Sequence, residues 1–201
     1  MPPASAALAL LLLAAAPAPE LEAIDVAWDA AVAARDEAAF LSRVAPDSVF
    51  AGGALQVGRD AIRKGWARYL TPGGPTLRWK PTGSGMAASG DLGWTVGEAS
   101  YAWKEKGVAP SPVRYVTVWA KDEQGRFLAV LDASLESPTG GAPLRRAVRT
   151  VTSRDGTLEA TLGTWTRGDG RETGAYLVIR ERTAEGWRTV VESEIPSPPA
   201  K

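Results

Sequence analysis

The N-terminal third of the chain carries apolar side chains at helical spacing. Ile24, Trp28 and Val32 recur every four residues and predict an amphipathic helix. Asp36 and Asp60 each precede a further run with the helical period, and each is expected to cap a helix. The pattern therefore predicts two or three helices before the first long strand.

Beyond these helices the period changes to two, which is typical of strands with one buried face. The predicted strands are Ser48–Ala51, ahead of the third helix, and then Leu77–Lys80, Met86–Ala88, Leu92–Trp103, Val113–Lys121 and Phe127–Ser134. Helices followed by a run of antiparallel strands predict an α+β fold with the helices on one face of the sheet.

The C-terminal part of the chain continues the strand pattern without a helical stripe before it. Its four predicted strands are Leu144–Thr152, Thr157–Thr166, Thr173–Thr183 and Trp187–Ile195. Thr95–Gly97 reappears as Thr161–Gly163, and Tyr115–Gly125 reappears as Tyr176–Gly186. We interpret this part as a helix-less partial repeat, and an unrelated β-meander is the alternative. Such a sheet has little core of its own, so the first domain or a second copy has to cover its apolar face.

Residues 1–18 resemble a targeting segment. Ala6–Ala16 is an unbroken apolar run followed by small residues and prolines, although no Lys or Arg precedes it. The run is too short to span a hydrocarbon core about 30 Å thick, and its order is typical of a cleavable secretory signal. We expect export to the periplasm or the extracellular space, cleavage near Ala16 or Ala18, and no stable membrane anchor afterwards. The alternative is an Ala- and Leu-rich helix start or a wrongly assigned start codon.

The composition excludes several kinds of chemistry. The 201 residues include 23 basic and 23 acidic residues, no His and no Cys. Without His and Cys there is no Ser-His-Asp triad, no Cys-His pair, no disulfide and no metal site built from these side chains. Zero net charge argues against a nucleic-acid partner, because such proteins neutralise phosphates with excess Lys and Arg. We therefore expect no metal, no cofactor and no nucleic acid.

Several segments in combination resemble one superfamily. They are Asp47–Phe50, Gly58–Ile62, Ser89–Gly97, Arg114–Trp119 and Val130–Asp132, with Trp28, Ala31 and Asp36 in the opening helices. Their order is similar to that of the nuclear-transport-factor-two-like superfamily, which includes ketosteroid isomerase and the SnoaL-like proteins. The resemblance covers residues 21–138 and is greatest with a branch defined only as a domain of unknown function.

This resemblance implies a cystatin-like cone, in which a curved antiparallel sheet wraps the helices and leaves a pocket at its open end. The expected organisation is a signal peptide at residues 1–18, the cone domain at residues 20–137 and the extra four-stranded antiparallel meander at residues 142–196.

Asp132 is the strongest candidate for a catalytic acid or base. It follows Phe127–Leu131, which is apolar on both faces, so its carboxyl group is expected to be desolvated and its pKa raised. Ketosteroid isomerase uses a carboxylic acid and a tyrosine inside such a cone, and Asp132 and Tyr115 match these residue types. The His that SnoaL-like cyclases use is absent. The alternative for Asp132 is a structural carboxylate that is paired with the backbone or an arginine.

Five further side chains are candidate ligand contacts, namely Trp28, Tyr69, Glu98, Tyr101 and Trp119. Aromatic walls suit small apolar ligands, although core packing is an alternative use of the rings. Glu98 shares a strand face with apolar neighbours, so it is either a pocket acceptor or a charge that discourages sheet association.

These observations leave functions of different classes. The favoured one, given the missing His and Cys, is an exported non-catalytic module that binds a small apolar ligand or forms a homodimer through its sheet. The alternative is a small-molecule isomerase, dehydratase or hydrolase of the ketosteroid-isomerase type, using Asp132 and a tyrosine. Convergence of Asp132 and a tyrosine hydroxyl on one cavity favours the enzyme, and pairing of Asp132 with an arginine disfavours it. A third function is a structural dimer module whose cone is filled by aromatic rings.

Overall fold

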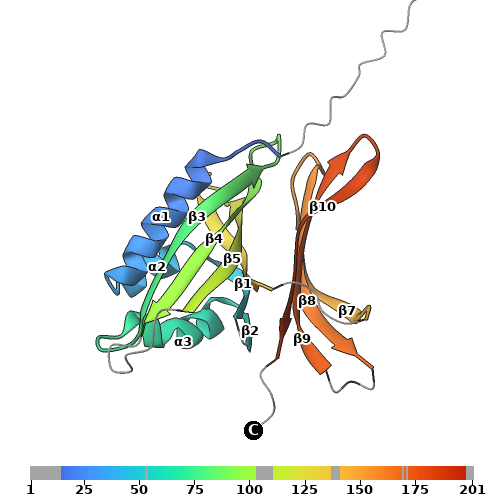
Figure 1. Ribbon diagram of the computed structural model, residues 1–201. Helices are drawn as coiled ribbons and strands as arrows, with labels where there is room; N and C mark the ends of the chain where they lie inside the picture. Colours follow the sequence, from blue (N-terminus) through green and yellow to red (C-terminus); the bar gives the residue numbers. More distant parts are fainter. Residues whose placement is uncertain are drawn as a thin grey trace, which may run out of the picture.

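The structure, a computed structural model, describes residues 15–52, 54–102, 111–136, 141–168, 170 and 172–197. Figure 1 shows three layers, with helices on one side, a six-stranded sheet in the middle and a four-stranded sheet beyond it. The helices are α1 (Pro19–Ala33), α2 (Glu37–Ser42) and α3 (Arg59–Leu70). The first sheet contains β1 (Val44–Gly52), β2 (Ala54–Val57), β3 (Thr76–Met86), β4 (Leu92–Ala102), β5 (Ser111–Lys121) and β6 (Phe127–Leu135). The second contains β7 (Leu144–Thr152), β8 (Leu158–Arg167), β9 (Glu172–Thr183) and β10 (Gly186–Pro196). The predicted α+β class is confirmed.

The six-stranded sheet is mixed, so the prediction of a wholly antiparallel sheet was wrong. Its order is β2-β1-β6-β5-β4-β3, and β1 runs parallel to β6 with Phe50 opposite Asp132. The chain leaves β1, passes through β2, α3 and the meander of β3 to β5, and returns beside β1 in the same direction. Alternation along a strand indicates which face is buried, but it does not identify the neighbouring strand.

β3 is a single strand where the sequence pattern predicts two short ones. Pro81 was expected to end the strand but lies inside it, and the register with β4 shifts between Pro81 and Gly83. Because β3 is the edge strand of its sheet, the N–H that proline lacks is not needed on the outer side.

The three helices lie on one face of the six-stranded sheet and enclose an aromatic core (Figure 1). The Trp28 indole stacks on Phe40 with ring centroids 5.2 Å apart, and Trp66 stacks on the same Phe40 ring at 4.7 Å. Trp119 of β5 meets Trp28 edge-on at 5.4 Å. These rings fill the inner part of the cone, so its free space lies elsewhere.

Of the two predicted N-cap residues, Asp36 is confirmed and Asp60 was wrong. Asp36 caps α2, because its Oδ1 accepts a hydrogen bond of 2.9 Å from the backbone N–H of Ala39. The N-cap residue of α3 is Gly58 rather than Asp60. Gly58 has a φ of +83°, which residues with a Cβ rarely adopt. Asp60 instead lies in the first turn, where its negative charge interacts favourably with the positive end of the helix dipole.

The second sheet packs its apolar face on the face of the first sheet that points away from the helices. The buried side chains at this interface include Val116, Val118, Leu131 and Ala133 of the first sheet and Leu158, Ala160, Leu162, Leu177 and Ile179 of the second. The apolar face of the meander is therefore covered by the cone domain and not by a second copy of the chain, the other option that the sequence left open. The same contact occupies the sheet face through which a homodimer was expected.

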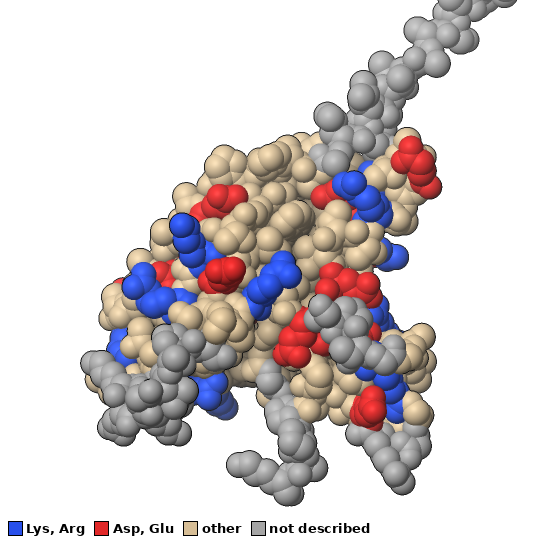
Figure 2. Space-filling model, viewed as in Figure 1, with Lys and Arg blue, Asp and Glu red and all other residues tan. Residues whose placement is uncertain are grey.

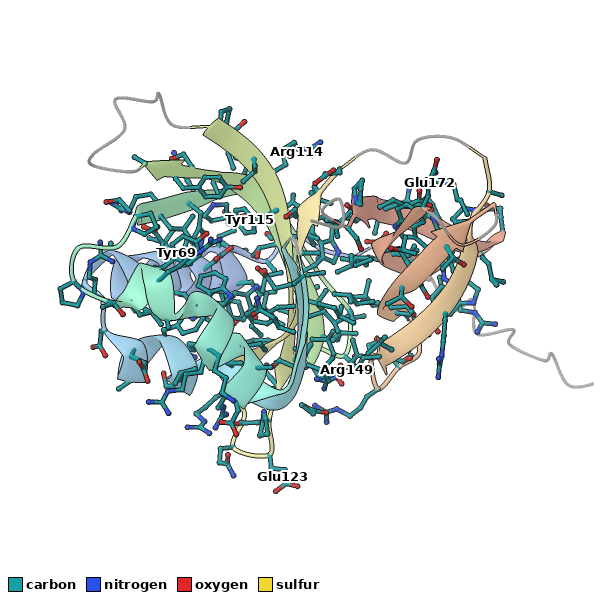
Figure 3. All side chains as sticks on the ribbon, turned by 90° about the horizontal axis from the view of Figure 1, so that it is seen from below. Tyr69, Arg114, Tyr115, Glu123, Arg149 and Glu172 are labelled. Carbon is teal, nitrogen blue, oxygen red and sulfur yellow. The ribbon has the colours of Figure 1, made fainter. Side chains whose placement is uncertain are left out.

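Polar contacts also join the two sheets. Arg149 of β7 lies on the side of the second sheet (Figure 3) and forms a salt bridge of 2.9 Å with Asp47 of β1. The buried hydroxyl of Ser193 on β10 donates to the backbone oxygen of Ser134 at 2.9 Å and accepts from the N–H of Glu136 at 2.8 Å. These bonds link the meander to β1, to β6 and to Glu136 directly after β6.

Two hairpin turns, one from each sheet, form a clamp of reciprocal hydrogen bonds, in which a backbone N–H of each turn donates to an aspartate of the other. The N–H of Ser89 donates to Asp155 at 2.8 Å, and the N–H of Arg154 donates to Asp91 at 3.0 Å. Burial acts to raise the pKa of Asp155, but hydrogen bonds from Ser153, Thr157 and the Ser89 N–H outweigh it and lower the pKa. The ionised form of Asp155 therefore stabilises this contact.

Each sheet contains the same pairing of a glycine on one strand with a tyrosine on the next. Gly97 of β4 lies opposite Tyr115 of β5, and Gly163 of β8 lies opposite Tyr176 of β9. A Cβ on Gly97 would come within 2.7 Å of the Tyr115 ring, and one on Gly163 within 2.6 Å of the Tyr176 ring. Each glycine therefore makes room for a tyrosine ring that crosses it. The strand before each glycine also shifts register at the equivalent place, after Pro81 in β3 and after Ala147 in β7.

The described N-terminal residues are attached to the cone domain. Ala16 forms a β-bridge with Met86, and Ala18 is buried beside α1. Residues 1–14, which form most of the expected signal peptide, lie outside the described residues. Within the described part of the chain, no helix has both the length and the apolar character to cross a membrane.

Candidate functional site

A cavity of about 340 Å³ opens at the end of the cone between α3 and the six-stranded sheet. Its lining includes Gln56, Trp66, Arg68, Tyr69, Tyr101, Tyr115, Asp132, Ser134 and Glu136. Figure 3 labels Tyr69 of α3 and Tyr115 of β5, which both lie on the helix-covered side of the sheet. Because helix and strand residues contribute together, the cavity exists only in the folded chain.

Asp132 lies in the wall of this cavity. It is partly exposed there, and its Oδ2 accepts a hydrogen bond of 2.7 Å from the Thr117 hydroxyl on β5. Among the described residues Asp132 has no ion-pair partner. Burial raises the pKa of Asp132 to about 7, the negative charge of Asp25 adds to the increase, and the bond from Thr117 opposes it. A carboxyl group with this pKa is able both to give and to take a proton near neutral pH.

Tyr115 lines the same cavity, but its hydroxyl is engaged elsewhere. It donates a hydrogen bond of 2.8 Å to Oδ2 of Asp25, a residue of α1 that is fully buried. Burial, followed by the charge of Asp25, raises the pKa of Tyr115 further above its ordinary value. The tyrosine proton therefore points to α1 and is not offered to a molecule in the cavity.

Two other tyrosines stand at the mouth of the cavity. The Tyr69 ring lies 4.6 Å below the Arg68 guanidinium, which also donates a hydrogen bond of 2.6 Å to the Tyr69 hydroxyl. Tyr101 is 36% exposed, and burial together with its neighbour Tyr69 raises its pKa. A phenolic hydroxyl is able to donate a hydrogen bond to a bound molecule.

The remaining predicted contacts lie outside this cavity. Trp28 is buried in the aromatic core, and Trp119 is buried there with its indole N–H donating to Thr95 at 2.9 Å. Glu98 is exposed, and it lies opposite Lys80 and Arg114 on the neighbouring strands. Successive side chains of β4 point to opposite faces of the sheet. Thr95 and Gly97 face the helices, so Glu98 faces the other side.

Asp25 is not among the predicted site residues, although the sequence carries a signal for it. Leu21, Asp25, Trp28 and Val32 follow one helical face, and all four are buried in α1. Ile24, which belongs to the predicted stripe, is partly buried and packs against the same core. An acidic residue at an apolar position of such a stripe is a sign of a buried carboxylate with hydrogen-bond donors around it.

The neighbouring carboxylate, Asp29, is also buried, but a cation pairs with it. The Arg78 guanidinium binds Asp29 through two nitrogens, with the shortest distance at 2.7 Å, and the N–H of Trp79 donates to it at 2.7 Å. The described residues contain no cluster of three or more acidic side chains that is arranged to hold a metal ion.

The profile of the SnoaL-like domain family matches residues 26–130, just over half of the chain. The chain belongs to the SnoaL-like family. This match ends two residues before Asp132, so the cavity wall extends beyond the matched segment of the SnoaL-like domain. No curated protein is similar enough to count as a match.

Several solved structures are similar to a little more than half of this SnoaL-like protein. A ketosteroid isomerase-like protein from Erwinia carotovora atroseptica has 18% identity and a TM-score of 0.46, over 58% of this chain and 94% of the other. An NTF2-like protein of unknown function from Pseudomonas putida has 18% identity and a TM-score of 0.49, over 59% and 88%. The association domain of CaMKII from C. elegans has 12% identity and a TM-score of 0.47, over 58% and 92%.

Proposed function

We propose that this SnoaL-like protein binds a small, partly polar molecule in its cone cavity and that Asp132 exchanges a proton with that molecule. The observation that carries the proposal is the position of Asp132, which lines a cavity without an ion-pair partner among the described residues. A largely desolvated carboxyl group without a cationic partner costs stability, and groups with perturbed pKa values are concentrated at functional sites.

The cavity supports a molecule of modest size and mixed polarity. Its volume of about 340 Å³ lies at the low end of small-molecule sites. Trp66 and Leu77 provide apolar walls, whereas Asp132 and Ser134 provide polar groups. This mixture supports a ligand more polar than the apolar one expected from the sequence.

The proton transfer would run through Asp132 without Tyr115. With its pKa near 7, Asp132 is protonated in a sizeable fraction of molecules at neutral pH and ionised in the rest. Tyr115 donates its hydrogen to Asp25, so the tyrosine hydroxyls available to orient a ligand are those of Tyr69 and Tyr101. The reaction class is that of an isomerase, a dehydratase or a hydrolase, in which one acid–base group moves a proton on the substrate.

Binding without catalysis is the second candidate function. It is favoured by the absence of His and Cys from the sequence, because it requires Asp132 only as a hydrogen-bonding group. Self-association through the six-stranded sheet is not proposed, since the described residues of the second sheet cover that face.

The first experiment is mass spectrometry of small molecules that co-purify with the full-length protein, compared with two variants. Ser134→Phe places a ring in the cavity and should abolish co-purification. Glu98→Gln alters an exposed residue outside the cavity and should retain it. Equal recovery from Ser134→Phe and the wild type would place the bound molecule elsewhere and contradict the proposal.

The second experiment separates the two functions with the molecule so identified. Asp132→Asn keeps the shape of the side chain but removes its exchangeable proton. Turnover that is lost in this variant while binding remains supports proton transfer. No turnover by the wild type, with binding unchanged in Asp132→Asn, supports the binding module instead.

We also propose that the chain is exported, on the basis of the apolar N-terminal run. Processing would leave Ala16 in place, since it pairs with Met86 in the folded domain. Mass spectrometry of the protein recovered from the periplasm or the medium would identify the cleavage site. Recovery of an unprocessed chain in the cytoplasm would contradict export.

A further inference from the structure

We propose that Gln56 is a ligand-binding residue of the cone cavity: its side-chain oxygen accepts a hydrogen bond from the end of the ligand that lies farthest from Asp132. The ligand class is a small molecule with an apolar middle and a polar group at each end, in which the group at Gln56 is a hydroxyl or an N–H. This inference rests on the proposed function of the cavity and adds a contact for the far end of its ligand.

Gln56 lies in line with Asp132 across three strands of the six-stranded sheet. Phe50 of β1 pairs with Gln56 of β2 on one side and with Asp132 of β6 on the other. Paired residues of neighbouring strands point to the same face of a sheet, and all three residues line the cavity. Strands that are two places apart are separated by roughly 10 Å. The row therefore places one polar side chain on each side of an aromatic ring.

The side-chain oxygen of Gln56 is a hydrogen-bond acceptor without a donor. This atom, Oε1, is buried, and none of the described residues donates to it. A buried acceptor that makes no hydrogen bond costs stability, and most buried polar atoms of folded proteins have a partner. Because Gln56 lines the cavity, a donor group on a bound molecule would supply the missing hydrogen bond.

Gly65 of α3 leaves the space in which the Gln56 amide lies. A Cβ at this position would collide with the carbon, the oxygen and the nitrogen of that amide. Gly65 lies in the middle of α3, where glycine costs stability relative to alanine. The close approach of the amide gives a physical reason for glycine at this position. It also holds the amide between β2 and α3, in the wall of the cavity.

The part of the cavity wall between Gln56 and Asp132 is apolar. Phe50 stands between them in the row, and Trp66 of α3 meets the Phe50 ring edge-on with the ring centroids 6.1 Å apart. A ligand that is polar along its whole length would lose water against these rings without gaining partners. A ligand with an apolar middle instead buries that middle against the rings and brings its polar ends to Gln56 and Asp132.

Side-chain NMR signals provide a direct test, because the chain contains two glutamines and no asparagine. The 15N-labelled full-length protein therefore gives two pairs of side-chain NH2 signals, one from Gln56 and one from the exposed Gln124 in the turn between β5 and β6. The probe is para-hydroxyacetophenone, a flat ring with a donor at one end and an acceptor at the other. It should shift the Gln56 pair and leave the Gln124 pair in place. The methyl ether, para-methoxyacetophenone, lacks the donor and should bind roughly three- to tenfold more weakly.

Three variants separate ligand binding from a structural role. Gln56→Leu removes the acceptor, so the preference for the hydroxyl compound should fall below about twofold. Its melting temperature should stay the same or rise, because an unpaired buried acceptor has been removed. Gly65→Ala should displace the amide and reduce the same preference. Gln124→Leu is the matched control and should change neither quantity.

Three outcomes would overturn the inference: neither compound binds, both bind the wild type equally, or Gln56→Leu keeps the wild-type preference. Equal binding of both compounds that is lost in Ser134→Phe would contradict only the role of Gln56. Binding of both compounds that is unchanged in Ser134→Phe would place the probe outside the cavity, and it would contradict the proposed function as well.

Discussion

The hydroxyl of Thr117 on β5 donates a hydrogen bond of 2.7 Å to Asp132 on β6. The two residues are direct cross-strand partners, and both face the helices. This bond opposes the effect of burial on the pKa of Asp132, so Thr117 limits how strongly the carboxyl group holds its proton.

Thr117→Val should therefore raise the pKa of Asp132. The substitution keeps the shape of a fully buried side chain but removes the donor that stabilises the carboxylate. We expect the midpoint of Asp132 to rise by roughly one pH unit, measured from its carboxyl signal by NMR. A fall in the midpoint would show that the Thr117 hydroxyl accepts from Asp132 instead of donating to it.

Asp132 should also impose a pH dependence on stability. Its pKa is about 7 in the folded protein and about 4 in an unfolded chain. Between these values the folded state holds a proton that the unfolded state has released, so the free energy of unfolding falls as the pH rises from 4 to 7. The loss should amount to roughly 2–4 kcal/mol.

Urea unfolding at several pH values measures this dependence. The free energy of unfolding of Asp132→Asn should change less between pH 4 and pH 7 than that of the wild type, because the variant has no carboxyl group to titrate. Parallel curves for the two proteins would contradict the raised pKa.

The interface between the sheets should carry much of the stability of the whole chain. Leu177→Ala removes a fully buried side chain at this interface and should lower the free energy of unfolding by about 2–5 kcal/mol. Leu144→Ala is the matched control, because Leu144 of β7 is 78% exposed, and its effect should stay within about 0.5 kcal/mol.

Removal of residues 140–201 tests the same interface at larger scale. The apolar face of the six-stranded sheet would then meet water, and we expect the shortened chain to aggregate. A soluble shortened chain that melts at the temperature of the full protein would show that the cone domain does not depend on the second sheet.

The clamp between the hairpin turns, in which the Ser89 N–H donates to Asp155, should make the stability of the protein fall in acid. Hydrogen bonds lower the pKa of Asp155, so its contribution is present above the unfolded value near 4 and is lost as the pH falls further. Asp155→Asn should cost about 1–2 kcal/mol at pH 7 and progressively less below pH 4. Unfolding free energies of both proteins at pH 7 and pH 2 measure the difference, and an equal cost at the two pH values would exclude an ionised Asp155.

Local pattern along the chain points to some of the side chains that line the cavity. Asp132 was identified because an apolar strand precedes it, and such a strand is buried wherever it lies. Tyr69 and Tyr101 also line the cavity. Trp28 and Trp119 were expected there but lie in the core. Aromatic residues occur at the same sequence spacing whether they line a cavity or fill a packed interior, so the pattern does not separate the two.

The pairing of Tyr115 with Asp25 lay beyond sequence reasoning, since these residues are 90 positions apart. A helix and a strand bring them together, and the contact needs the gap that Gly97 leaves. It also reverses the expected role of Tyr115, whose hydrogen points away from the cavity.

The sequence by itself determined the α+β class, the family, the four strands of the second sheet and the presence of an apolar face that needed cover. These features follow from residue periodicity and local motifs, which are properties of neighbouring residues along the chain. Only the tertiary structure decided that β1 pairs with β6, that the cone domain covers the meander, and that the free space lies beside Asp132. These outcomes depend on which distant surfaces fit together once water has been excluded, and a pattern along one strand or helix carries no record of its partner.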